Sequence, residues 1–469
     1  MFAKKNKSNQ IFFFILIFFG SIFNGSNSDN LILINFFIFI IFFLKLLSNK
    51  NNFTLVKYIF NKNYKLVYLF LFLILYILLQ SLPLPINWLK FFSNTYYDYL
   101  TNLNLKNFYS ISLNGTKSLI EAVNYINIFL IIIITQILFF KNKHYLRFLF
   151  FVVLVGFLHS FSAIFILLLG NPEFFLEKIV HYKSSATGFF INRSNFSFFL
   201  ILTFICGIHY IFIQYLKPFI DNSKKINFDL IYIRIFLVFI TIGIIASLSR
   251  LGNFYLISCL LIYILFSFQY FKKILNQFIL IALIFIVFDL FILGIYFGGL
   301  DLFDRFLFLN EELNFNDLLN REKNFSDVNN SLSPITRIEI ISIGLNFFKE
   351  FLFFGYGGGS FQSAFILFYE KFNLYYANHA HSDFIELMGE YGIIGLLIIL
   401  LIFYNIGKLS FKSFKDENNY FKIIILALIF LFLINGFVDF SLNIPSNQYL
   451  FASLYVIALK KKSKKLLNI

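Results

Sequence analysis

The chain alternates long apolar runs with short basic connections along its whole length, and this pattern restricts the folds open to it. A chain of 469 residues that is 59% hydrophobic and only 13% charged has more apolar surface than a soluble core needs. About twelve runs are long enough to cross the hydrocarbon core of a bilayer. They lie near residues 11–23, 31–47, 65–82, 119–140, 147–170, 196–216, 230–249, 252–270, 276–299, 383–406, 421–437 and 447–460. The sequence therefore predicts an all-α polytopic membrane protein with about twelve transmembrane helices.

Basic residues occupy every second connection between these runs. By the positive-inside rule this places both termini in the cytoplasm and the other set of loops outside it. It also accounts for the net charge of +15 through membrane topology, so we expect membrane lipids and no nucleic acid as partners. We expect the first run to be a retained anchor rather than a cleaved signal peptide. The basic connections contain Lys45, Lys50, Lys57, Lys62 and Lys65, then Lys141, Lys143 and Arg147, then Lys217, Lys224 and Lys225, then Lys272 and Lys273, then Lys408, Lys412, Lys415 and Lys422.

The runs divide the chain into four parts. Residues 1–299 are expected to hold nine transmembrane helices, and residues 383–460 three more. Between them, residues 300–382 form a large outward-facing loop, which is far too long for a simple connection. Residues 461–469 are expected to form a basic cytoplasmic tail. Within the large loop we expect short helices, including an amphipathic one on the membrane surface, since Ile338, Ile341, Leu345 and Phe348 follow a helical spacing.

Two arginines stand at the outward ends of apolar runs, where the topology does not favour positive charge. Arg193 lies in ATGFFINRSNF at the entry of the sixth run, and an arginine that extends toward the membrane surface would also explain it. Arg250 lies in IASLSRLGN, in a very short turn between two apolar runs. An arginine held there is suited to binding an anion, because its planar guanidinium matches phosphate oxygens, although it could also cap a helix.

A third arginine, Arg337, precedes the glycine-rich segment GYGGGSF at 355–361. Glycine-rich loops can bind phosphate through backbone N–H groups, but this one lacks the Lys-Ser/Thr of a nucleotide-binding loop. We therefore expect its glycines to form a turn that returns the chain to the membrane.

The segment NHAHSDFIELMGEYGIIG at 378–395 places polar residues directly before an apolar run. Asp383 and Glu386 have the spacing of a capping box, so a helix should begin near Asp383. His381 would then precede a helix N-terminus, whose positive end favours the neutral imidazole that a general base requires. Glu386 and Glu390 share one helix face and could orient a sugar or pair with an arginine. The alternative is that His379 and His381 bind a metal, with Asp383 or Glu386 as a further ligand.

Five motifs in this order resemble the O-antigen ligase and polymerase superfamily of bacterial envelope enzymes. They are ATGFFINRSN, SLSR, Arg337 ahead of FLFFGYGGGSF, HAHSDFIELMGEYGIIG and VDFSLNIPSN. The segment SISLNGTKSLIEAVNY at 110–125 is also similar to the region before the fourth helix of that superfamily. The resemblance covers roughly residues 80–460. One departure is Ser382, where the superfamily usually has asparagine.

The resemblance implies a GT-C type fold and transfer of a glycan from an undecaprenyl-pyrophosphate carrier, without cofactor or metal and with inversion. It identifies His381 as the catalytic base and Arg193, Arg250 and Arg337 as pyrophosphate ligands, with His379, Asp383, Glu386 and Glu390 in support. The implied site faces the periplasm across the bacterial inner membrane. The expected acceptor is lipid A-core, as in a ligase, or the growing glycan, as in a polymerase. A transporter or flippase is the alternative from another class, but its polar residues should lie near the bilayer midplane and its halves should repeat.

Overall fold

The computed structural model describes residues 2–105, 107–139, 144–172, 184–221, 228–270, 337–369, 377–415 and 420–459. Eleven helices in these ranges coincide with the predicted apolar runs. They are α1 (Phe2–Ile22), α2 (Asp29–Leu47), α4 (Tyr64–Ser81), α7 (Gly115–Leu138), α8 (Tyr145–Leu168), α9 (Arg193–Asp221), α10 (Phe228–Ala246), α11 (Arg250–Tyr270), α17 (Asp383–Phe414), α18 (Lys422–Val438) and α19 (Pro445–Ala458). The predicted run at 276–299 and the basic tail at 461–469 lie outside the described residues.

The predicted class, an all-α polytopic membrane protein, is confirmed. Among the described residues, seven helices are long and apolar enough to cross a membrane: α2, α4, α7, α8, most of α9, α10 and α17. Three further apolar helices are shorter, at Lys7–Ile22, Arg250–Phe266 and Lys422–Val438. Because a helix satisfies its own backbone hydrogen bonds, such apolar runs can be stable in lipid only as helices or closed barrels.

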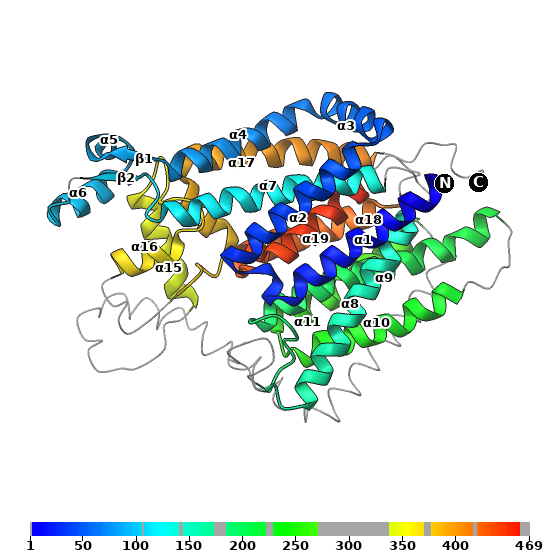
Figure 1. Cartoon of the computed structure of the whole chain (residues 1–469). Coiled ribbons are helices and arrows are strands. Elements are labelled where there is room, and N and C mark those ends of the chain that lie inside the picture. The colour runs from blue at the N-terminus through cyan, green and yellow to red at the C-terminus, as the bar shows by residue number, and fades with distance from the viewer. Residues whose placement is uncertain are drawn as a thin grey trace.

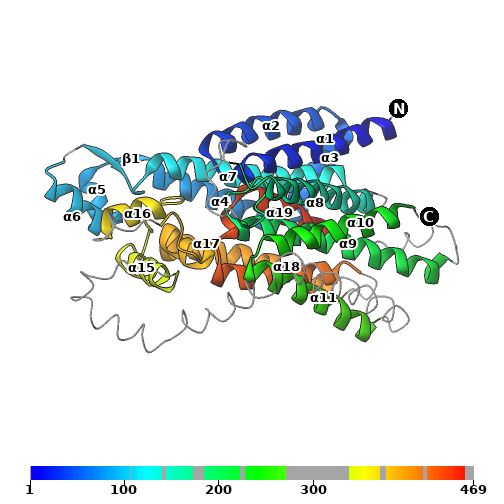
Figure 2. The same ribbon diagram turned by 90° about the horizontal axis from the view of Figure 1, so that it is seen from below.

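The long helices form one bundle, and the smaller elements gather at one of its ends. Figures 1 and 2 both place the start of α1 at the opposite end from α5 (Ile86–Phe92), α6 (Asn94–Asn102), α15 (Arg337–Glu350) and α16 (Phe361–Phe368). We call the end that carries these four short helices the distal end. The strands β1 (Pro83–Pro85) and β2 (Phe108–Ser110) also lie there and pair antiparallel, with Pro85 opposite Phe108.

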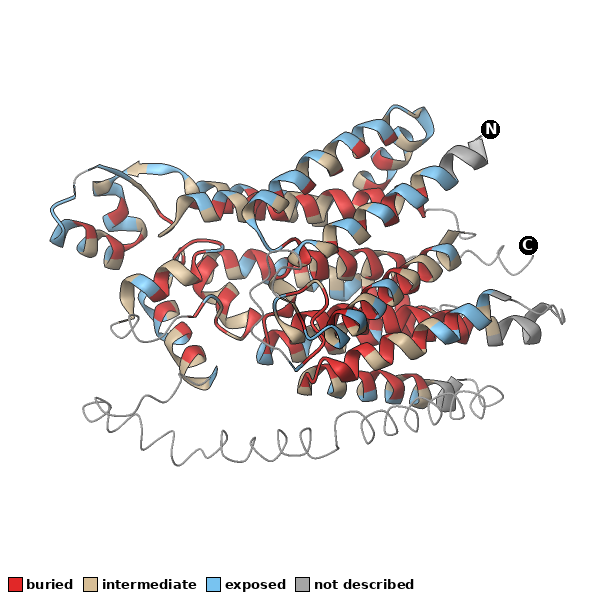
Figure 3. Ribbon diagram, turned by 60° about the horizontal axis from the view of Figure 1, so that its bottom comes forward, coloured by how far each residue is buried: buried red, intermediate tan, exposed pale blue. Residues whose placement is uncertain are grey.

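Burial is deepest at the centre of the bundle. Within the apolar part of α9, Arg193–Gln214, an 18-residue stretch is entirely buried, and α8, α10 and α19 pack around the helix. Figure 3 shows this buried centre and the exposed outer faces of the peripheral helices. A second apolar cluster lies at the distal end and joins Leu89, Tyr96 and Leu100 of α5 and α6 to α15 and α16. The distal end therefore has a small core of its own.

The sequence missed several elements at the edges of the bundle. Helix α3 (Lys50–Lys62) lies in what the charge pattern indicated as a basic loop, and 83–110 forms β1, α5, α6 and β2 rather than a simple connection. The expected amphipathic helix is present as α15. Ile340, Gly344 and Phe347 are buried because the helix packs on α17 through the glycine, whereas Leu345, on the face expected at the membrane surface, is exposed.

Candidate active site

The candidate site is built around the turn that leads into α17. Ser382 is the N-cap of this helix: its backbone is extended and its side chain accepts a hydrogen bond from the Ile385 N–H. Its hydroxyl also donates to the Gly436 carbonyl at 2.8 Å, which joins the start of α17 to α18. The predicted cap at Asp383 is therefore wrong by one residue. Asp383 is the first helical residue, because the serine oxygen already meets a free N–H group of the first turn.

The two histidines of this turn have different contacts. His379 Nδ1 lies 3.0 Å from Glu386 Oε1, and the Ala380 N–H donates to Glu386 Oε2 at 3.0 Å. Phe440, which follows α18, stacks on the His379 ring with the centroids 4.5 Å apart. The same phenyl ring meets the His381 ring edge to face at 5.1 Å. Glu386 and Phe440 thus hold the turn from two sides.

His381 carries backbone strain. Its φ of 55° lies in the left-handed region, which costs a residue other than glycine on the order of 1–3 kcal/mol. Its Nδ1 is buried and has no hydrogen-bond partner among the described residues. Strained residues persist where their surroundings hold them in place, and they are frequent at functional sites. Two independent features of the structure therefore point to His381.

The electrostatic environment also separates the two histidines. Burial and the positive charge of Arg337 lower the pKa of His381 to about 4. Burial acts to lower the pKa of His379 too, but the charge and hydrogen bond of Glu386 outweigh it, so this pKa is raised. Near neutral pH His381 is therefore neutral and can accept a proton, whereas His379 is favoured to hold one.

The three arginines do not have the same relation to His381. Arg337 begins α15, and its charge acts on the pKa of His381, so the structure brings these two predicted site residues together. Arg193 and Arg250 begin α9 and α11. The starts of α9 and α11 pack closely, since a Cβ on Gly252 would meet Ser197. These two arginines thus begin neighbouring helices.

A set of buried hydrogen bonds joins α9 to α17 and α18. Asn435 Nδ2 donates to Asp383 Oδ2 at 2.7 Å, and the Ser441 hydroxyl lies 3.0 Å from Asn195 Oδ1 and 2.8 Å from Asp439 Oδ2. Asn447 donates to the backbone carbonyls of Asn195 and Ser441. Asp383, predicted to support the site, thus fastens helices together. We call this set the polar joint: Asn195, Asp383, Asn435, Asp439, Ser441 and Asn447.

Backbone hydrogen bonds also attach α17 to the segment that follows α15. The Tyr356 and Gly357 N–H groups donate to the carbonyls of Gly389 and Glu390, both at 3.0 Å. The Ile393 and Ile394 N–H groups donate to the carbonyls of Leu352 and Phe353. We call this contact between residues 352–357 and 389–394 the glycine crossing.

Glycine is required where the two segments of the crossing meet. A Cβ on Gly355 would collide with the Glu390 carbonyl, and one on Gly392 would lie 2.5 Å from the Gly355 nitrogen. Gly392 also has φ 59° and ψ −170°, and it divides α17 into a short first helix and a long second one. The glycines of GYGGGSF therefore form a close backbone contact.

The two glutamates of α17 have separate partners. Glu386 holds the histidine turn, as described above. Glu390 is 5% exposed, and its carboxylate lies near the backbone of Gly359 and Phe361. Its predicted roles were sugar binding or pairing with an arginine, but the structure places it against the glycine-rich turn.

Several residues of this site were not singled out from the sequence. Asp439 and Phe440 lie in VDFSLNIPSN, which contributed to the resemblance without a role for either residue. Glu121 of α7 packs over Gly358 and Gly359, and its charge also acts on His379. A lone carboxylate in an apolar helix was the one available signal for Glu121.

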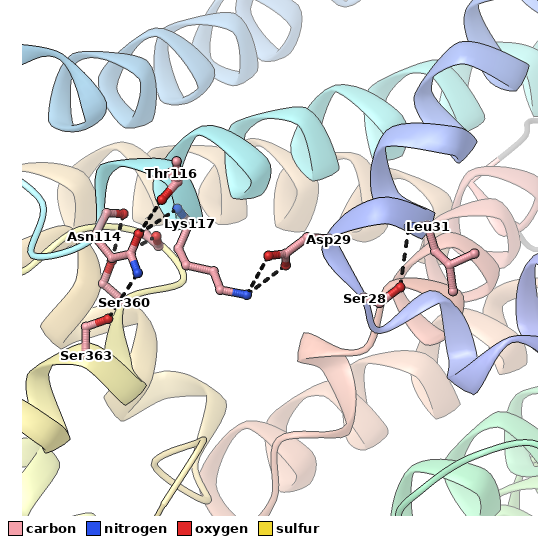
Figure 4. Close-up of polar contacts among 9 residues, drawn as sticks. Ser28, Asp29, Leu31, Asn114, Thr116, Lys117, Ser360 and Ser363 are labelled. Carbon is pink, nitrogen blue, oxygen red and sulfur yellow. Dashed lines mark hydrogen bonds and ion pairs between the residues drawn. The ribbon is translucent and has the colours of Figure 1, made fainter. Parts of the chain in front are cut away.

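The start of α7 completes the surroundings of the glycine-rich turn. Asn114 caps α7 by accepting a hydrogen bond from the Lys117 N–H at 3.1 Å, and it also contacts α16 through Ser363. Lys117 Nζ forms an ion pair with Asp29 of α2 at 2.8 Å (Figure 4). Within the described ranges, no three His, Cys, Asp or Glu side chains are grouped so that they could hold a metal ion.

The fold and the site together define a class: a multi-pass α-helical membrane protein with a strained, neutral histidine beside an arginine at one end of its bundle. Within that class, residues 235–400, roughly a third of the chain, match the family model described as O-antigen ligase. The match includes Arg250, Arg337 and the histidine turn, and it supports the predicted resemblance to the O-antigen ligase and polymerase superfamily. This resemblance implies glycosyltransferase-like activity on lipid-linked glycans. No curated protein matches the chain.

Proposed function

We propose that this protein transfers a glycan from an undecaprenyl-pyrophosphate carrier to an acceptor hydroxyl at the periplasmic face of the inner membrane, as an O-antigen ligase with lipid A-core as acceptor. The observation that carries the proposal is the state of His381. A buried, neutral imidazole in a strained turn beside Arg337 is what a general base next to an anionic leaving group requires.

The proposed reaction exchanges one glycosidic oxygen for another. His381 takes the proton of the acceptor hydroxyl while the oxygen attacks the anomeric carbon. The bond from that carbon to the pyrophosphate oxygen breaks, and the electron pair leaves with the pyrophosphate. Arg193, Arg250 and Arg337 stabilise the departing anion, and attack opposite the leaving group inverts the anomeric centre. No metal takes part in this scheme.

The proposed roles of the remaining residues follow from their contacts. Glu386 raises the pKa of His379, which favours its protonated form, and, through Ala380, holds the backbone of the turn. When protonated, His379 adds a positive charge near the site of the leaving group. Asp383 and Glu390 act at a greater distance, through the polar joint and the glycine crossing.

The orientation in the membrane is supported by the charge pattern. The C-terminal ends of α2, α7 and α9, which precede basic connections in the sequence, lie at the opposite end of the bundle from the start of α17. By the positive-inside rule that end faces the cytoplasm, so the distal end faces the periplasm.

The test compares His381→Ala with His144→Ala, a histidine before α8 at the other end of the bundle. In membranes supplied with lipid-linked glycan, loss of a general base should reduce transfer by about 10²–10⁴-fold. The His144 variant should keep normal transfer, and metal chelation should leave the wild type active. Normal transfer by a well-expressed His381→Ala protein would remove His381 as the base.

The pH profile provides a readout that loss of structure does not mimic. Because the pKa of His381 is about 4, transfer should stay level below neutral pH and fall as the pH approaches 4. Arg337 lowers this pKa, so Arg337→Gln should shift the acid limb to higher pH in addition to reducing the rate. An acid limb that does not move would contradict the pairing of these residues.

The glycan phenotype of a deletion strain identifies the acceptor. Loss of glycan attachment to lipid A-core indicates a ligase. Loss of chain length with attachment intact indicates a polymerase that uses the growing glycan as acceptor.

A further inference from the structure

The small distal element between α4 and α7 exposes large apolar side chains on one side. Trp88 and Phe91 are 60% and 80% exposed, and their spacing puts them on one face of α5. Phe108, opposite Pro85 in the strand pair, is exposed as well. Leu89 on the other face of α5 is fully buried in the distal core. This element is therefore amphipathic, and its apolar face is uncovered.

The exposed face continues from the outer faces of two spanning helices. Phe91 and Phe92 contact Phe354, whose carbonyl accepts a hydrogen bond from Gln80 at the end of α4. Next to it, the exposed Phe353 is hydrogen-bonded through its carbonyl to Ile394 of α17. On α4 and α17, the exposed faces near these points carry Leu75, Leu79, Leu82, Leu397 and Leu400. Since α4 and α17 are candidate membrane spans, this band of leucines faces acyl chains.

We propose that residues 83–110 dock on the bilayer, with α5 lying in the interface of the leaflet at the distal end and Trp88 and Phe91 inserted among its lipids. The exposed face that carries Trp88 and Phe91 is continuous with the leucine band of α4 and α17, so we expect it to contact lipid rather than water. Tryptophan is enriched at this depth, where an apolar ring meets polar headgroups. Lys90, exposed between the two aromatic residues, can extend its ammonium to lipid phosphate.

This docking would set the height of the candidate site above the membrane. The buried face of α5 and α6 packs in the same distal core as Ile340 and Phe361, which belong to α15 and α16. Lipid contact on the exposed face of α5 would therefore influence the position of α15, which begins with Arg337.

Trp88 is the one tryptophan of the chain, so the native protein carries its own probe. The full-length protein is reconstituted in vesicles of phosphatidylethanolamine and phosphatidylglycerol, with or without bromine on the acyl chains. We expect brominated lipid to remove most of the tryptophan emission and aqueous iodide to remove little of it. Trp88→Phe gives the baseline, and Phe72→Trp in that background reports a lipid-facing position on α4.

A second variant tests the docking without disturbing the fold. Phe91→Ser changes a side chain that is 80% exposed, so the fold should survive, while Trp88 should shift to longer emission wavelengths and become accessible to iodide. Quenching of the wild type by iodide and not by brominated lipid would overturn the proposal in favour of a face in water. Quenching by neither would also overturn it, because protein would then cover the face.

Discussion

The polar joint and the glycine crossing both fasten α17 to its neighbours, but with opposite chemistry. In the joint, side chains bond to side chains: Asn435 holds Asp383, and Ser441 lies between Asn195 and Asp439. In the crossing, backbone bonds to backbone, and glycine lets the two segments approach. The joint therefore depends on which polar groups are present, whereas the crossing depends on the absence of a Cβ.

This difference explains how the histidine turn can be strained and still keep one conformation. The turn precedes the first, short helix of α17, with the joint at its beginning and the crossing at its end near Gly392. Both attachments are buried, so little water competes for their hydrogen bonds. The surroundings thus hold the left-handed backbone of His381 in place.

The largest expected effect comes from adding one carbon to the crossing. Gly392→Ala should lower the free energy of unfolding by about 3 kcal/mol or more, because its backbone conformation is open essentially to glycine alone and the methyl group has no space. Thermal unfolding in detergent measures the loss. Gly407→Ala in the same helix is the matched control, since nothing lies within 4 Å of its Cβ position. Equal losses in both variants would show that the crossing is not closely packed.

A smaller effect is expected in the joint, where a hydrogen bond is lost without a steric clash. Ser441→Ala should destabilise the protein by about 1–2 kcal/mol, because buried Asp439 loses a partner while its Oδ1 already has none among the described residues. Ser446, a few residues on and equally buried, has a hydroxyl for which those residues offer no partner. Ser446→Ala should leave stability unchanged. The same unfolding assay compares the two, and a loss confined to Ser446→Ala would contradict this account of the joint.

The sequence predicted the bundle well because few backbone conformations are stable for an apolar run in lipid. Runs of that length become helices, and the described ones did, within about five residues at most ends, although α1 begins nine residues earlier and α17 ends eight residues later than predicted. The prediction that α17 begins near Asp383 held for a related reason, since capping chemistry is local. The resemblance implied that Arg337 and His381 belong to one site, and in the structure the charge of Arg337 acts on the pKa of His381.

The sequence was less informative wherever a partner distant in the chain decides the outcome. Helix α15 has apolar residues on several faces, so periodicity alone could not show that α17 would contact Gly344. Helices α5 and α6 are only seven and nine residues long, too short to show a clear helical period in the sequence. Asp439 is a single carboxylate in the sequence, and its place beside the histidine turn depends on how α18 packs against α17.

The smallest effect is expected from the exposed ion pair between Asp29 and Lys117, which joins α2 to α7 (Figure 4). Lys117 lies in the first turn of α7, where a positive charge is unfavourable, and Asp29 offsets it from the first turn of α2. Both side chains are about 40% exposed, so solvent and salt screen the attraction. A double-mutant cycle with Asp29→Asn and Lys117→Met should therefore give a coupling energy of about 1 kcal/mol or less. This coupling should shrink further as salt is added. A coupling as large as the loss in Gly392→Ala would place the ion pair with the crossing among the contacts that hold the distal end together.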